Sequence, residues 1–121
     1  MKRLLRFIDV MAAAAVVFLS FVHTFAFGSL HIGAPTQAEV WFAGAGAAMF
    51  FAGAMNLVRW HDRSRLLAAL CALACLIMIA LVLCFGAAIG SFGPWQVVVQ
   101  LGLYAVLLVF SMGDALRKAD E

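Results

Sequence analysis

Charge is scarce in this sequence. Only 12% of the 121 residues are charged and two are proline, whereas 67% are hydrophobic and the mean hydropathy is +1.10. A soluble domain carries about a quarter of its residues as charged side chains, so water is the wrong solvent for this chain. The eight basic residues lie beside apolar segments, as membrane topology signals do, and we expect no nucleic-acid partner.

Catalytic and redox motifs are also missing from the sequence. The three cysteines, Cys71, Cys75 and Cys84, fall in one apolar segment without a CxxC pair, which argues against a disulfide framework or a redox pair. Neither a nucleophile beside a base nor a cofactor fingerprint can be recognised in the sequence. We therefore predict that the protein is not an enzyme, that it has no catalytic residues and that it needs no cofactor.

Four apolar runs fill most of the chain. A helix needs roughly 20 apolar residues to cross a hydrocarbon core about 30 Å thick. The runs cover about 10–30, 38–58, 66–89 and 95–112. The sequence thus predicts an all-α polytopic membrane protein, an antiparallel bundle of four transmembrane helices that forms a single domain over residues 1–121.

Turn and interface residues separate the runs. Gly90–Pro94 (GSFGP) predicts a tight turn, and Trp41 and Trp60 bracket the second run as interfacial tryptophans do. The basic head before the first run is also typical of a signal peptide. The run is longer than a signal-peptide core, His23 interrupts it and no A-x-A site follows, so we expect this segment to be retained.

Lysine and arginine predict the orientation. They occur only in the head, in the middle loop and in the tail: Lys2, Arg3, Arg6, Arg59, Arg63, Arg65, Arg117 and Lys118. Because such loops remain in the cytoplasm, we predict a multi-pass protein of the bacterial inner (plasma) membrane with cytoplasmic N- and C-termini. The basic middle loop, 59–65, is expected to touch anionic lipid headgroups. Asp9 is expected to pair with Arg6 or to stay hydrated.

Small residues predict how the first two helices pack. Helices in lipid associate where small side chains let their backbones approach closely. The first stripe consists of Ala12, Val16, Ser20, Thr24 and Gly28. The second consists of Gly44, Ala48, Ala52 and Asn56, with Ala45, Met49 and Gly53 as a neighbouring row. We predict that the two stripes face each other and that Asn56 caps or bridges helices.

Polar side chains within the runs are the functional candidates, because polar groups in lipid are costly. His23 lies roughly 22 Å above the cytoplasmic end of the first run. Three polar residues of the fourth run recur every four positions and share one helix face. If that face meets the first run, a speculative ligand or proton path is formed by His23, Gln96, Gln100 and Tyr104.

The same polar residues also have simpler structural interpretations. His23 can donate one hydrogen bond across the bundle while the glutamines hold the fourth helix in register. A metal site would have to combine His23 with His31, Glu39 and Cys84, whose spacing matches no known site, so we predict no metal. Haem would require paired axial histidines inside the bundle. Buried cysteines pack as small hydrophobes.

The segment from His31 to Asn56 contains two short motifs that resemble those of other membrane proteins. Its core Trp41–Gly46 reads WFAGAG and it ends in Asn56-Leu57. In these residues it resembles small, uncharacterised four-helix bacterial inner-membrane proteins, and that resemblance implies a membrane bundle but no activity. The chain lacks the first-helix glutamate of small multidrug exporters, the polar third-helix track of fluoride channels and the CxxC of quinone-linked disulfide enzymes.

The expected function follows from the abundance of small residues and the shortage of catalytic groups. We expect a non-enzymatic helix bundle or accessory subunit in the lipid bilayer, acting through helix–helix contacts as a homo-oligomer or with a membrane protein partner. The alternative is a small transporter or channel with a polar path near His23, Gln100 and Tyr104.

Overall fold

The computed structural model describes residues 1–27, 36–62 and 64–117, and every regular element in these residues is helical. The elements are α1 (Lys2–Val22), its π-helical continuation η1 (His23–Phe27), α2 (Gln37–His61), α3 (Arg65–Ala88) and α4 (Trp95–Ala115). Four helical stretches are long and apolar enough to cross a membrane: Lys2–Phe25, Gln37–His61, Arg65–Ala88 and Trp95–Ala115. The predicted all-helical class is confirmed.

Local side-chain chemistry explains where the helices begin and end. Before α2, the backbone N–H of Thr36 donates to Glu39 Oε2 at 2.6 Å, and the N–H of Glu39 donates to Thr36 Oγ1 at 3.3 Å. This reciprocal capping box satisfies amide groups that have no partner inside the helix. Ser64 caps α3 by accepting from the N–H of Leu67. After α3, Gly90 adopts a φ of +67°, which favours glycine.

Three helix boundaries lie outside the predicted runs, and one of them is the end of α4, which is at Ala115 instead of near residue 112. The first helix begins at Lys2 rather than near residue 10, because lysine and arginine are good helix formers and their heads can stay in water. The second helix continues to His61 instead of ending near residue 58, so Arg59 belongs to the last turn of α2 and not to a loop. The predicted end of the first run, 28–30, lies outside the described residues.

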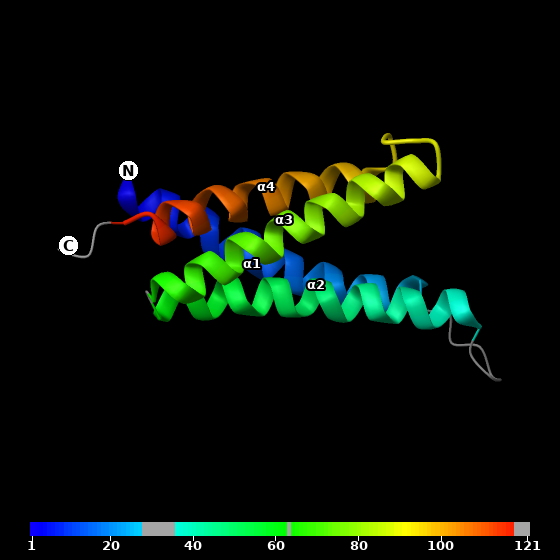
Figure 1. The fold of residues 1–121 in the computed structure, drawn as a ribbon, viewed down its shortest axis with the longest axis horizontal. Helices are drawn as coiled ribbons and strands as arrows, with labels where there is room; N and C mark the ends of the chain where they lie inside the picture. The colour runs from blue at the N-terminus through cyan, green and yellow to red at the C-terminus, as the bar shows by residue number, and fades with distance from the viewer. Residues whose placement is uncertain (28–35, 63, 118–121) are drawn as a thin grey trace.

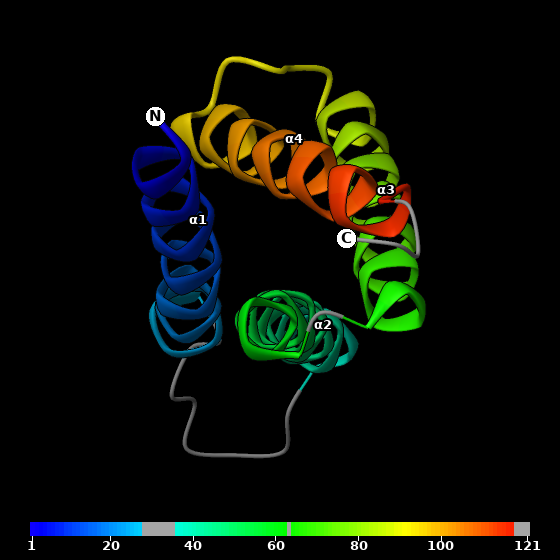
Figure 2. The same cartoon turned by 90° about the vertical axis from the view of Figure 1, so that its left-hand side faces the viewer.

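The helices form a ring in the order α1, α2, α3, α4, which is seen end-on in Figure 2. The closest packing is within two pairs, α1 with α2 and α3 with α4. The start of α1, the end of α2, the start of α3 and the end of α4 lie at one end of the molecule, which we call the terminal end, while the α3–α4 turn lies at the opposite, distal end (Figure 1). The two pairs diverge toward the distal end.

The core is narrow and is shared by all four helices. Val16 from α1, Met49 from α2, Cys75 from α3 and Leu107 from α4 are all buried in one cluster. Many large apolar side chains face outward instead, among them Phe18, Phe51, Leu66, Leu81, Trp95 and Val109. An apolar exterior around a small core is what a bundle surrounded by lipid needs, and the four long apolar helices fit a membrane protein.

Two glycines bring α1 and α2 together. A Cβ atom on Gly53 would lie 2.8 Å from Val17 Cγ2 and 3.1 Å from the carbonyl oxygen of Ala13. A Cβ atom on Gly46 would collide with the Thr24 side chain and lie 3.3 Å from the carbonyl oxygen of Ser20. The backbones therefore approach as closely as the absence of a side chain allows.

The predicted small-residue stripes coincide with this seam only in part. Ser20 and Ala52 are buried, and Thr24 and Ala48 are half-buried. Gly44 is exposed, and a Cβ atom there would have no heavy atom within 4 Å. The α2 seam thus runs through Gly46 and Gly53, and Gly44 points away from it. Gly28 lies outside the described residues.

Candidate functional site

An arginine in the last turn of α2 is the most deeply buried charge of the described residues. Arg59 is 1% exposed. Its Nη2 donates to Asp9 Oδ1 at 2.6 Å, its Nη1 donates to Asp114 Oδ2, and its Nε donates to Asn56 Oδ1 at 3.3 Å. The guanidinium group therefore connects α1, α2 and α4 through its planar set of donors.

Two neutral side chains complete this cluster. Ser111 Oγ donates to Asn56 Oδ1 at 2.9 Å, which links α4 to α2 a second time. Asn56 Nδ2 donates to the Ala52 carbonyl at 2.9 Å and lies 3.7 Å from Cys75 Sγ on α3. We call this cluster the charged hub and define it as Asp9, Asn56, Arg59, Ser111 and Asp114.

The charge of the hub is balanced once Arg117 is counted with it. Arg59 faces two carboxylates, and Asp114 also pairs with Arg117, whose Nη2 lies 3.0 Å from Asp114 Oδ1. Two positive groups thus meet two negative ones. Burying charge is costly unless each group is paired and hydrogen-bonded, a condition that this arrangement meets.

A cavity of about 490 Å³ opens beside the hub at the terminal end. Its charged lining consists of Lys2, Arg6, Asp9, Arg59, Asp114 and Arg117. Its apolar lining consists of Leu5, Trp60, Val109 and Phe110, with Gly113 beside them. A space of this size, lined by both charged and apolar side chains, is large enough for a small molecule.

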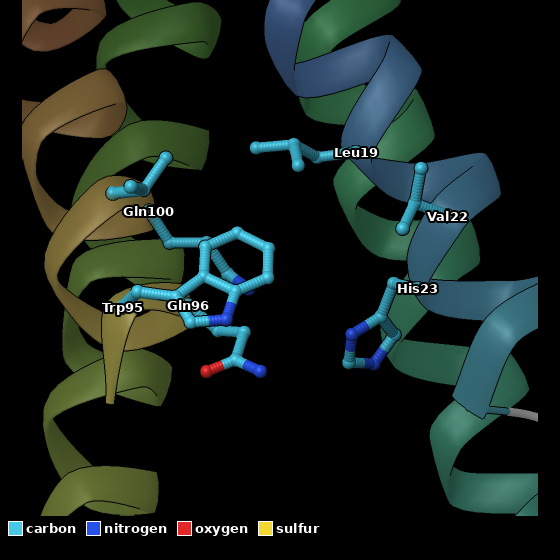
Figure 3. Close-up of a pocket in the computed structure, with 7 residues that line it drawn as sticks. Leu19, Val22, His23, Trp95, Gln96 and Gln100 are labelled. Carbon is cyan, nitrogen blue, oxygen red and sulfur yellow. The ribbon is translucent and has the colours of Figure 1, made fainter.

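The residues predicted to form a polar path lie mainly in the distal half. His23, Gln96 and Gln100 line one small pocket together with Leu19, Val22, Trp95 and Val99 (Figure 3). In Figure 3 the His23 ring faces Gln96 and Trp95 across this pocket. The pocket measures about 20 Å³, which is room for about one water molecule. The His23 ring also stacks on Phe42, with centroids 5.0 Å apart.

Tyr104 does not line this pocket. It is fully buried in the core cluster of α4, and its hydroxyl group has no hydrogen-bond partner in the described part of the chain. The two hydroxyl groups of the α1 stripe bond within their own helix. Ser20 Oγ donates to the Val17 carbonyl at 2.6 Å, and Thr24 Oγ1 donates to the Ser20 carbonyl at 2.8 Å.

Residues 1–27, 36–62 and 64–117 contain no cluster of three or more histidine, cysteine or acidic side chains that could hold a metal ion. Cys71 and Cys75 are buried, whereas Cys84 is exposed. His31, which the sequence places near a candidate outer mouth, lies outside these residues.

The hub corrects two expectations drawn from the sequence. Asp9 neither pairs with Arg6 nor stays hydrated, because it is 7% exposed and bonds to Arg59. Arg59 does not reach lipid headgroups, because α2 continues past it and turns it into the bundle. Asn56 bridges helices, as predicted.

A spacing signal for the hub was present in the sequence. Asn56 and Arg59 are three residues apart, as are Ser111 and Asp114, and side chains with this spacing share one helix face. Each pair lies at the same end of its predicted helix. Polar pairs at the same end of two helices therefore indicate a polar cluster between those helices.

Comparison with known proteins gave no assignment: no family model matches the chain, and neither a curated protein nor a solved structure matches it.

Proposed function

We propose that the chain is a non-enzymatic, multi-pass protein of the bacterial inner membrane that acts through its helix surfaces, as a homo-oligomer or as an accessory subunit. The observation that carries this proposal is a small-residue face on α2 outside the bundle. Ala43, Gly44 and Ala47 are exposed, in contrast to Gly46 and Gly53, which face α1. A second helix can approach such a face as closely as α1 approaches the other side of α2.

Orientation belongs to the same proposal. We infer an antiparallel transmembrane bundle with both termini in the cytoplasm. All basic residues of the described chain belong to the terminal-end segments, namely Lys2, Arg3, Arg6, Arg59, Arg65 and Arg117. The positive-inside rule supports a cytoplasmic terminal end. Single cysteines at Arg3 and Gly93 in a cysteine-free background, labelled with an impermeant maleimide in spheroplasts, test this orientation: labelling at Gly93 alone is expected, and labelling at Arg3 alone contradicts it.

The helix-surface proposal is tested by the oligomeric state in lipid nanodiscs. Leucines at Gly44 and Ala47 would hold a partner helix away, so the variant G44L/A47L is expected to lose a homo-oligomer or a co-purifying membrane protein. Ala80→Leu is the matched control, because Ala80 is an exposed alanine of α3 surrounded by large side chains such as Leu76 and Leu81. Wild-type protein that is monomeric and binds no partner would contradict the proposal.

A second candidate function is transport of a small polar solute or of protons. Polar side chains follow the inside of the bundle from the charged hub to the distal pocket. Asn56 contacts Cys75, and Tyr104, whose hydroxyl has no hydrogen-bond partner among the described residues, lies in the same core cluster as Cys75. Gln100 and His23 line the distal pocket. A chain of such groups can pass a proton or a water molecule through an apolar bundle.

Flux through proteoliposomes tests this second candidate. A proton or solute flux that falls in His23→Ala and Gln100→Leu would support the path. The exposed control Val98→Ala, on the outside of α4, should leave that flux unchanged. If neither His23→Ala nor Gln100→Leu alters the flux, these residues play no part in transport.

A further inference from the structure

The cavity at the terminal end carries an excess of positive charge. Its lining sets four basic groups against two carboxylates: Lys2, Arg6, Arg59 and Arg117 against Asp9 and Asp114. Both carboxylates are already paired with arginines. Within the ranges that the structure describes, no carboxylate forms an ion pair with Lys2 or Arg6. The hub and Arg117 together are therefore neutral, and the net positive charge of the cavity comes from Lys2 and Arg6 on α1.

The two α1 cations are placed to act on one ligand. Lys2 and Arg6 are four residues apart in α1, so they lie one above the other on the same helix face, and both line the cavity. Arg117 reaches the cavity from the end of α4. Val109 and Phe110 of α4 add apolar lining. A ligand here meets both positive charges and hydrocarbon.

The geometry points to an anion site in this cavity that takes a phosphate-bearing ligand, held by Lys2 and Arg6 with Arg117 at its edge. Guanidinium groups match the oxygen geometry of phosphate, and the lysine adds a compact charge. The cavity volume of about 490 Å³ lies within the range of small-molecule sites and far exceeds the needs of one water molecule. This inference does not depend on the small-residue face of α2.

Phosphate can reach the cavity from two sources, as the headgroup of an anionic phospholipid or as a free ion. The apolar wall beside the charges can accommodate the glycerol and first acyl carbons of a lipid, whereas a free phosphate would use the charged side alone. The two sources are separable because one belongs to the bilayer and the other to the buffer.

Fluorescence of Trp60 reports on the cavity, because this side chain lines it. In the full chain, Trp41→Phe and Trp95→Phe leave Trp60 as the only tryptophan. This reporter protein is studied in nanodiscs of phosphatidylcholine titrated with inorganic phosphate. In the other arm, the phosphatidylglycerol content of the nanodiscs is raised in phosphate-free buffer. Sodium chloride at equal ionic strength controls for screening, and native mass spectrometry counts the lipid molecules retained.

The decisive variant is Lys2→Gln with Arg6→Gln, compared with Arg3→Gln with Arg65→Gln. Both variants remove two positive charges from exposed positions, but Arg3 and Arg65 do not line the cavity. All four positions are exposed, so both variants should fold, and circular dichroism checks this. Arg59 is left unchanged because its loss would disturb the hub.

We expect binding of phosphate or phosphatidylglycerol, measured from Trp60 emission or retained lipid, to weaken about tenfold or more in K2Q/R6Q. It should stay near wild type in R3Q/R65Q. Saturation by inorganic phosphate identifies the free ion as the source. Saturation only with phosphatidylglycerol identifies the lipid headgroup. The inference is overturned by equal weakening in both variants, which would mean general surface charge, or by the absence of both an emission change and retained lipid in the wild type.

Discussion

The two ends of the bundle are held together in different ways. At the terminal end, Arg59 joins three helices through paired charges, and Asn56 extends the network to the fourth. At the distal end the two helix pairs diverge, and polar residues meet around a pocket of about 20 Å³ (Figures 1 and 3). One end is held by paired charges inside the bundle, and the other places polar and aromatic side chains around a small pocket.

This difference shows which end of the bundle determines the arrangement of the helices. A buried arginine between two carboxylates tolerates little displacement, because each charge becomes costly once its partner is lost. At the distal end, His23 stacks on Phe42, and Gln96 and Gln100 are half-buried around the same pocket. The terminal end therefore fixes the relative positions of α1, α2 and α4.

The largest expected effect comes from removing the hub arginine. Arg59→Met leaves Asp9 and Asp114 without their shared partner and should lower the free energy of unfolding by about 3–5 kcal/mol. Reversible unfolding in mixed detergent micelles measures this change. Arg65→Met, at an exposed position on α3, should change it by less than about 0.5 kcal/mol.

A rescue variant distinguishes lost charge balance from lost packing. Adding Asp9→Asn and Asp114→Asn to Arg59→Met removes the uncompensated carboxylates and should restore a large part of the stability. If the triple variant is as unstable as Arg59→Met alone, the two ends do not differ in the way described above.

A smaller effect is expected at the α1–α2 seam. Gly53→Ala places a methyl group 2.8 Å from Val17 Cγ2 and 3.1 Å from a backbone oxygen, and should cost about 1–3 kcal/mol of unfolding free energy. Gly44→Ala meets open space and should leave the monomer unchanged or raise its stability by up to about 1 kcal/mol. Equal losses in both variants, measured in dilute micelles, would show that the seam does not run through Gly53.

The smallest effects compare two buried hydroxyl groups. Ser111→Ala removes the hydrogen bond to Asn56 in the hub and should cost about 0.6–2 kcal/mol. Tyr104→Phe removes a hydroxyl that has no partner among the described residues, so the unfolding free energy should stay constant or rise slightly. A loss above about 1 kcal/mol in Tyr104→Phe would mean that this hydroxyl bonds a group or a water molecule inside the bundle, which would favour the transport path.

The helices could be predicted from the sequence because their signals are local. Long apolar runs, Gly90 and the interfacial tryptophans are each recognisable within a short window. The start of α1 could not be predicted in the same way. Lys2, Arg3 and Arg6 are polar and were assigned to a head segment, although helix formation depends on propensity and not on polarity.

The candidate site was only partly predictable because it depends on contacts between distant segments. His23, Gln96 and Gln100, which the sequence places at similar depth on two helices, line one small pocket, whereas Tyr104 does not. The hub was missed because Asp9 and Asp114 lie 50 and 55 residues from Arg59 in the sequence, and each was placed near a polar boundary. One extra helical turn in α2 changes Arg59 from a loop residue into a buried one.

The hub can form only late in synthesis, because its members are far apart in the sequence. Asp9 is made first, Arg59 follows at the end of the second helix, and Asp114 comes in the last turn of α4, so a growing chain carries Arg59 with one carboxylate until α4 has been made. A truncated chain that ends before Asp114 would retain an arginine with half of its counter-charge. Burying this arginine with one carboxylate is costlier than burying it with two, so the terminal end of the bundle reaches its final stability only after α4 has been made.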